Sequence, residues 1–364
     1  MSINEIIIYM MAVFMVLGAL DRIFGNRFGL GQQFEEGIMA MGSLALAMIG
    51  IISLAPALAA VLKPVLVPLY KALGADPAMF AGSILACDMG GAPLATELAG
   101  SREAAQFGGL LVGSMLGPTI VFTIPVALGI LSQDDLPYLA KGVLAGLITV
   151  PLGCLAGGLV AGFPIGMILR NLVPIVLFAL LLALGLWKAE RVMIRGFAIF
   201  GKIIVAVITF GLAVAIFQAL TGLTIFSKLA PISEGIEVVG NIAIILAGAF
   251  PLIFVITKLF RKPLMKLGKL MGINETAAAG MVASLANSIP MFGMVKDMDR
   301  RGKIVNVAFA VSAAFVFGDH LGFTAGYDAD MLFPMIVGKL VGGITAVTVA
   351  LLITRGAKYG QSAA

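Results

Sequence analysis

Charged side chains are scarce in this sequence. Asp, Glu, Lys and Arg together make up 12% of the 364 residues, whereas a soluble globular chain carries about a quarter. Hydrophobic residues make up 60%, and no water-soluble fold hides that much apolar surface. The net charge of +5 needs no nucleic-acid partner, because it follows from Lys and Arg crowding into the loops of one side, the positive-inside pattern of membrane proteins.

Signatures of soluble enzymes and metalloproteins are also missing. The sequence has no phosphate-binding Gly-Lys-Ser/Thr loop, no Gly-x-Ser-x-Gly motif and no metal-binding pair of histidines. Its two cysteines, Cys87 and Cys154, lie in apolar segments without metal-ligand spacing, so we expect neither a disulfide nor a metal site. The sequence therefore predicts a chain that is not an enzyme, holds no cofactor and does not by itself use ATP.

Long apolar runs are what the sequence does contain. Runs of about 20 residues cross a hydrocarbon core of about 30 Å as helices, so the pattern predicts an all-α polytopic membrane protein in a lipid bilayer. The apolar segments are 4–24, 37–61, 106–131, 138–162, 169–188, 201–222, 237–260, 304–326 and 331–353. Two further segments, 77–100 and 275–298, are interrupted by the breaks Asp88-Met89-Gly90-Gly91-Ala92-Pro93 and Asn287-Ser288-Ile289-Pro290.

The two broken segments belong to an internal repeat with a spacing of 198 residues. This spacing pairs Gly50 with Gly248 and Gly74 with Gly272, and it preserves the order of helices and breaks. The predicted organisation is a first membrane repeat at 1–162, a linker helix and loop at 163–198, a second membrane repeat at 199–356 and a C-terminal tail at 357–364.

The distribution of basic residues bears on whether the broken segments cross the membrane. If all eleven segments span, the Lys and Arg residues divide 13 to 11 between the two faces of the membrane. If 77–100 and 275–298 are re-entrant hairpins, the Lys and Arg residues divide 18 to 6. The second division favours nine spans plus two hairpins, an N-terminus outside and a C-terminus inside with Arg355 and Lys358. The repeats are then inverted, as in many secondary transporters. Eleven spans remain the alternative.

Charged groups inside apolar segments are costly and usually functional, and most of those found here are acidic. They are Asp88, Glu97, Glu237, Asp319 and His320. An acidic site within the membrane suits a small organic cation. Asp88, beside Gly90 and Gly91, is the first candidate for holding an ammonium group, with capping of the following half-helix as the alternative.

Further candidates come from the second repeat. Asn287 and Ser288 are expected either to offer hydrogen bonds to a substrate hydroxyl or simply to cap a helix. Asp319 and His320 are expected to bind substrate or relay a proton, or to form an internal bond that stiffens a helix break. Aromatic rings that could attract an ammonium are Phe292, Phe323 and Tyr327.

Several stretches carry a resemblance to a known family. They are Gln33-Phe34-Glu35-Glu36-Gly37, Met79-Phe80-Ala81-Gly82, Ala86-Cys87-Asp88-Met89-Gly90-Gly91, Gly113-Ser114-Met115-Leu116-Gly117-Pro118-Thr119, Asn287-Ser288-Ile289-Pro290-Met291-Phe292-Gly293-Met294, Phe317-Gly318-Asp319-His320-Leu321-Gly322-Phe323 and Phe333-Pro334-Met335-Ile336-Val337-Gly338-Lys339. Together they resemble the ethanolamine permease family of bacterial ethanolamine utilisation. The resemblance implies ethanolamine as substrate and the bacterial cytoplasmic (inner) membrane as location.

The residues alone leave alternatives open. These are a channel-like facilitator, an ion-coupled transporter of another small organic cation, and, in a different class, a membrane-embedded receptor or enzyme. A homo-oligomer is also compatible with the sequence, because small residues such as those from Gly338 to Gly343 pack equally well between subunits and within one bundle. The mechanistic hypothesis places the substrate ammonium against Asp88 and its hydroxyl toward Asn287 or Asp319.

Overall fold

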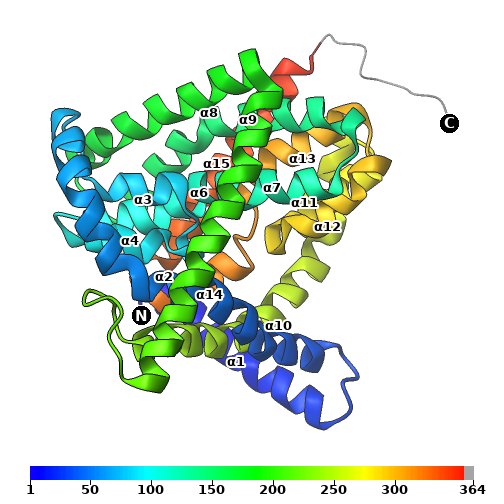
Figure 1. Ribbon diagram of the computed structural model, residues 1–364. Coiled ribbons are helices and arrows are strands. Elements are labelled where there is room, and N and C mark those ends of the chain that lie inside the picture. The colour runs from blue at the N-terminus through cyan, green and yellow to red at the C-terminus, as the bar shows by residue number, and fades with distance from the viewer. Residues whose placement is uncertain (356–364) are drawn as a thin grey trace.

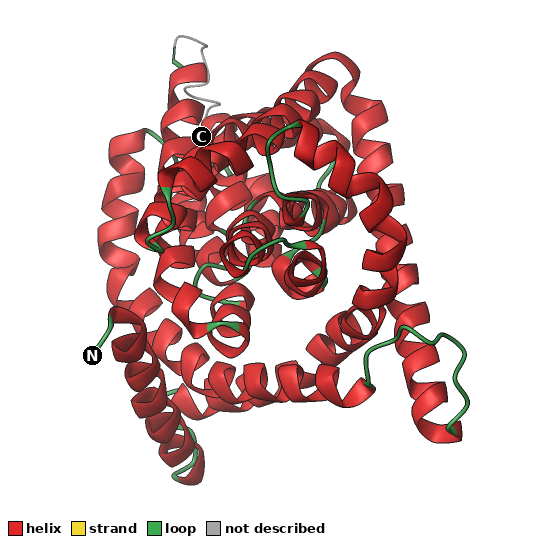
Figure 2. Ribbon diagram, turned by 90° about the vertical axis from the view of Figure 1, so that its left-hand side faces the viewer, coloured by secondary structure: helices red, strands yellow, loops and turns green. Residues whose placement is uncertain are grey.

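The computed structural model describes residues 1–355, so the predicted tail 357–364, with Lys358, lies outside the described residues. Within that range the chain forms helices and connecting loops and no strand (Figure 2). The α-helices are α1 (Ile3–Ile23), α2 (Leu30–Ala72), α3 (Ala78–Ile84), α4 (Gly91–Leu98), α5 (Arg102–Gln106), α6 (Leu116–Pro118), α7 (Ile124–Ile130), α8 (Leu136–Val160), α9 (Ile165–Thr221), α10 (Ile232–Met271), α11 (Glu275–Ala286), α12 (Ser288–Met294), α13 (Arg300–Ala313), α14 (Asp319–Tyr327) and α15 (Leu332–Ile353).

Short 3-10 and π segments connect several of these helices. The 3-10 segments are η1 (Cys87–Met89), η3 (Val112–Ser114), η5 (Gln133–Asp135), η6 (Val295–Asp297) and η7 (Ala329–Met331). The π-helical segments are η2 (Phe107–Leu111) and η4 (Thr119–Thr123). Both π segments lie in the path from α5 to α7, and π-helical turns are frequent at functional sites.

Eight helices among the described residues are long and apolar enough to cross a membrane. They are Ile3–Ile23, Leu30–Ala72, Arg102–Ile130, Gln133–Val160, Ile165–Ala189, Arg195–Thr221, Ile232–Leu259 and Ala329–Ile353. Two of them belong to α9, which kinks at Ala189 (φ −141°, ψ 45°). The prediction of an all-α polytopic membrane protein is confirmed.

The two interrupted segments fold back on themselves. The Gly100 amide donates to Asp76 Oδ2 at 2.9 Å, which joins the residues just before α3 and just after α4. In the second repeat, the Asn274 amide donates to Asp299 Oδ1 at 2.8 Å and joins the two ends of the α11–α12 segment in the same way. Each segment therefore returns to the side from which it started, and the structure favours hairpins over eleven spans.

One of the nine predicted spans, 304–326, is not a continuous helix, and this part of the prediction is corrected. The helix stops at Ala313 and resumes at Asp319. Between them, the Phe315 and Phe317 amides donate to the carbonyls of Ser284 and Leu285 at the end of α11. Because these two amides find acceptors on a neighbouring helix, the backbone leaves the helical path without losing its hydrogen bonds.

One pair of glycines 198 residues apart, Gly50 and Gly248, lies at close contacts between helices. A Cβ on Gly50 of α2 would lie 2.0 Å from the Ile208 carbonyl oxygen on α9, and one on Gly248 of α10 would lie 2.2 Å from the Met11 carbonyl oxygen on α1. Each long helix thus touches the first helix of the other half through a paired glycine. Both long helices also end at paired glycines with positive φ, Gly74 (69°) and Gly272 (67°).

The arrangement places the breaks of both halves near the middle of the bundle. α2 packs along α10, and α8 packs along α15 and α13. In Figure 1, the α3–α4 hairpin lies to the left of the central helices and the α11–α12 hairpin to the right, with α8 above and α1 and α10 below. The 3-10 segment η1 in the first hairpin contacts α2 and α14, so residues from both halves meet there.

The paired glycine contact predicts a sharp difference between two positions on one helix. Gly50→Ala is expected to lower the free energy of unfolding by about 1–3 kcal/mol, because its methyl group would collide with the α9 backbone. Gly42→Ala is the matched control, since nothing lies within 4 Å of a Cβ there. Thermal unfolding of the detergent-solubilised variants measures the difference, and equal melting temperatures would contradict the close contact.

Candidate functional site

A cavity of about 220 Å³ lies where the break of the first hairpin meets the helix break at 314–318 in the second half. One water takes about 30 Å³ of liquid volume, so the cavity has room for a ligand of a few non-hydrogen atoms. Its lining combines two carboxylates, the lone histidine and two phenylalanine rings with small and apolar groups. The lining residues are Ser43, Leu44, Ala47, Ala86, Asp88, Met89, Pro118, Phe122, Phe315, Asp319 and His320.

Asp88 reaches the cavity because the first hairpin turns sharply beside it. It lies in η1, and the next turn is made by Gly90 at φ 97°, a conformation that favours glycine. A Cβ at Gly90 would lie 2.2 Å from Ile51 Cγ1, so the turn also packs closely against α2. The N-terminus of α4 carries no side-chain cap. The capping alternative for Asp88 is thus not what the structure shows, and its carboxylate faces the cavity.

Asp319 enters the cavity from the second half, at the first residue of α14. The helix break before it contains Phe315, which has φ 64°, an unusual conformation for a bulky residue. Such a residue costs about 1–3 kcal/mol and tends to occur at functional sites. Here it turns the Phe315 ring into the cavity wall.

The aromatic wall consists of rings other than those expected from the sequence. The Phe315 ring packs edge-on against the Phe122 ring, with the ring centroids 5.4 Å apart. It also packs, in a tilted arrangement, against the His320 ring, with the centroids 5.2 Å apart. Phe292 on α12 and Phe323 on α14 are both buried and do not line this cavity. Faces of such rings attract an ammonium group through the negative face of the π system.

His320 connects the cavity to a buried lysine. Its Nε2 lies 3.8 Å from Asp88 Oδ1, and its Nδ1 lies 3.0 Å from Lys339 Nζ. Lys339 Nζ also donates to the backbone carbonyl of Ser114 in the first half. Only 1% of Lys339 and 3% of His320 is exposed. A line of polar groups therefore runs from α15 through His320 to the cavity.

Lys339 changes the charge balance that the sequence suggested. With Asp88 and Asp319 as carboxylates and Lys339 as an ammonium, the group carries one net negative charge, which one monovalent cation neutralises. A lysine inside a transmembrane segment is itself a functional signal. That signal was available in the apolar segment 331–353, but only the folded chain shows which acids it accompanies.

The remaining predicted residues lie away from this cavity. Asn287 Oδ1 accepts from the Ile289 amide at 2.8 Å, so Asn287 caps α12. Ser288 is buried, and its hydroxyl has no hydrogen-bond partner. Gly91 begins α4, where a Cβ would lie 2.7 Å from the Ala86 carbonyl oxygen. Of the predicted set, Asp88, Asp319 and His320 are brought together at the cavity.

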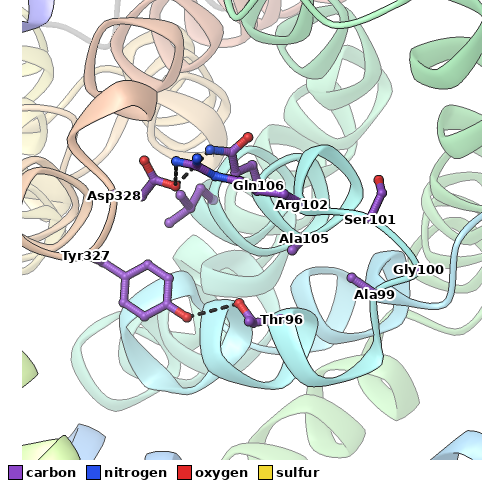
Figure 3. A pocket seen from close by; sticks show the side chains of 10 residues that line it. Thr96, Ala99, Gly100, Ser101, Arg102, Ala105, Gln106, Tyr327 and Asp328 are labelled. Atoms are coloured by element: carbon purple, nitrogen blue, oxygen red, sulfur yellow. Dashed lines mark hydrogen bonds and ion pairs between the residues drawn. The ribbon is translucent and has the colours of Figure 1, made fainter.

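A second, more open pocket of about 490 Å³ lies where the base of the first hairpin meets the end of α14 (Figure 3). Thr96 Oγ1 and the Tyr327 hydroxyl are 3.0 Å apart across this pocket, and the Tyr327 ring stacks on Phe323 at 5.2 Å. Gln106 Nε2 donates to Asp328 Oδ2 at 2.7 Å, beside Arg102. These contacts join the first half to the second.

Ligand atoms of Cys87, Asp88 and His320 lie within 4.8 Å of one another. Tetrahedral metal sites usually need three or four such donors. Here the Lys339 ammonium lies against the other nitrogen of His320 and adds positive charge, which opposes a metal cation. The arrangement suits an organic ammonium ion, which needs hydrogen-bond acceptors and no metal coordination shell.

Membrane-spanning helices, two hairpins and a cavity lined by charged side chains are features of a membrane transport protein. Residues 3–353 match the family described as "Ethanolamine utilisation protein, EutH", and the chain belongs to this family.

The chain is similar to three curated relatives named "probable ethanolamine permease EutH". The Listeria monocytogenes relative is 69% identical over 96% of this chain and 94% of its own. The relatives from Salmonella typhimurium and Escherichia coli are each 53% identical over 97% of this chain and 96% of their own. No solved structure matches the chain.

Proposed function

We propose that this chain transports protonated ethanolamine across the bacterial cytoplasmic membrane and binds it in the 220 Å³ cavity. Its family and the names of its relatives support the substrate and support a permease rather than an enzyme. The observation that carries the proposal is the convergence of Asp88 and Asp319, one from each half, on a cavity of this size.

The cavity chemistry matches the substrate in three respects. The ammonium group donates charge-assisted hydrogen bonds to the Asp88 and Asp319 carboxylates, and such bonds are about twice as strong as neutral ones. Phe122 and Phe315 offer ring faces to the same positive charge. The net charge of the cavity group is balanced by one monovalent cation. A small amino alcohol fulfils all three conditions.

The proposed topology follows the distribution of basic residues. The N-terminus lies outside and the C-terminus, with Arg355, lies inside, and the two repeats enter the membrane in opposite senses. Inverted repeats with breaks at mid-membrane support alternating access to one fixed site. Association of copies into a homo-oligomer stays a prediction.

Uptake of labelled ethanolamine into liposomes that hold the purified protein tests the proposal. Saturable uptake without an ion gradient is expected, together with faster entry of label when unlabelled ethanolamine is loaded inside. An imposed proton gradient then shows whether uptake becomes concentrative. Absence of uptake by protein that is folded and inserted would overturn the proposed function, and entry without saturation or counterflow would replace a carrier with a pore.

A further inference from the structure

Lys339 needs acceptors because it has no access to water. It lies on α15 with 1% of its surface exposed. A lysine ammonium carries three N–H donors and no acceptor, and burying them unpaired is costly. Two of its partners are known: the Ser114 carbonyl and His320 Nδ1, the latter at 3.0 Å.

The Ser114 carbonyl is free to accept for a reason visible in the sequence. In a regular helix it would accept from the amide of the residue four positions later. That residue is Pro118, which has no N–H. The break in the first half thus leaves an acceptor at the point where Lys339 arrives from the second half.

The same contact determines which nitrogen of His320 carries the hydrogen. With Lys339 as an ammonium, which can only donate, His320 Nδ1 accepts, and the ring hydrogen of a neutral imidazole then lies on Nε2. His320 Nε2 faces Asp88 and lies 3.8 Å from Asp88 Oδ1. That distance is too long for a direct hydrogen bond and leaves room for a ligand atom beside both groups.

We propose that Lys339 is a positioning residue that holds His320 as a hydrogen-bond donor to the cavity, and that this donor recognises the hydroxyl oxygen of the substrate. The inference rests on the proposed function and deepens it. The two polar groups of ethanolamine are two carbons apart, so its ammonium reaches Asp88 while its hydroxyl oxygen accepts from His320 Nε2. An amine without the hydroxyl leaves that donor unpaired, and sites of this kind discriminate strongly against such analogues.

The single histidine of the chain makes a direct test possible. In protein labelled with ¹⁵N-histidine, the two ring nitrogens give signals from His320 alone. We expect a protonated Nε2 and an unprotonated Nδ1 at neutral pH in the wild-type protein, and a changed tautomer ratio in Lys339→Met. A hydrogen on Nδ1 in the wild type, or an identical tautomer in both proteins, would overturn the proposal.

Binding of ethanolamine and of ethylamine gives the second test. Lys339→Met is expected to reduce the preference for ethanolamine over ethylamine about tenfold, the loss of roughly one hydrogen bond. His320→Gln is expected to keep most of the preference, because an amide N–H can donate without depending on Lys339. Lys141→Met is the control, since the exposed Lys141 lies at the equivalent repeat position.

The outcomes separate this proposal from the proposed function. Unchanged preference in Lys339→Met would overturn the positioning role even if ethanolamine is transported. A wild-type protein that binds neither amine would remove the proposed function, while the ¹⁵N signals would still decide whether Lys339 sets the His320 tautomer. If Lys339→Met does not fold, the proposal is tested by the tautomer of His320 in the wild-type ¹⁵N spectrum and by the binding preference of His320→Gln.

Discussion

Asp88→Asn is expected to weaken binding of protonated ethanolamine at least about 25-fold. Truncating one partner of a buried, hydrogen-bonded charge pair costs about 2–5 kcal/mol, and each 1.4 kcal/mol is tenfold in affinity. Asn keeps the size of the side chain, and Asp88 caps no helix, so the variant should insert and fold. Isothermal titration or scintillation proximity binding in detergent measures the affinity directly.

Asp330→Asn is the control for that experiment. Its side chain is 78% exposed, and its carboxylate pairs with the exposed Arg102. Its affinity for ethanolamine should match that of the wild type. Normal binding by Asp88→Asn would show that the ammonium is held elsewhere, and a matched loss in both variants would point to a general electrostatic effect.

Asp135→Asn should cost about 3–5 kcal/mol of stability. Asp135 accepts from Lys303 Nζ and, at 2.8 Å, from the Ser132 hydroxyl, and the Asp135 and Lys303 side chains are only 7% and 13% exposed. This pair joins η5 in the first half to α13 in the second. Breaking a buried pair by removing one partner leaves an uncompensated charge, here the Lys303 ammonium over the Tyr138 ring. The melting temperature in detergent reports the loss.

The neighbouring Asp134 provides the control, because it is exposed. Asp134→Asn should change the free energy of unfolding by no more than about 1 kcal/mol. A melting temperature for Asp135→Asn equal to that of Asp134→Asn would show that the pair contributes little. The other ion pairs between the halves, from Arg102 to Asp328 and Asp330, involve an Arg102 side chain that is 69% exposed, and they should likewise contribute little to stability.

The hairpins show how far sequence reasoning could reach. The division of Lys and Arg between the two faces already favoured re-entrant segments, because charge cannot easily lie within the bilayer and so reports topology. The bonds from Gly100 to Asp76 and from Asn274 to Asp299 agree with that reading. Gly50 and Gly248, which the 198-residue spacing pairs, both lie at close contacts between helices, and the twofold repeat stays a prediction.

The break at 314–318 could be read from the sequence only in part, from Gly318 and the Asp319-His320 pair that follows it. Ala314, Phe315, Val316 and Phe317 are apolar and contain no proline or glycine, so they resemble the interior of a helix. The chain leaves the helix there because carbonyls of α11 accept from its amides. Those acceptors lie on a different element, and no local pattern encodes their position.

What the sequence determined by itself is the class of the molecule, most of its spans, the interruptions in two apolar segments and the acids that lie within such segments. Hydropathy, proline, glycine and charge act locally or through topology, so they leave a readable pattern. The tertiary structure decided which of those parts form the site. Asp88, His320 and Lys339 lie on three elements, and Phe122 and Phe315 replaced the expected rings. Their convergence depends on the packing of helices from both halves, which arises only when the chain is folded.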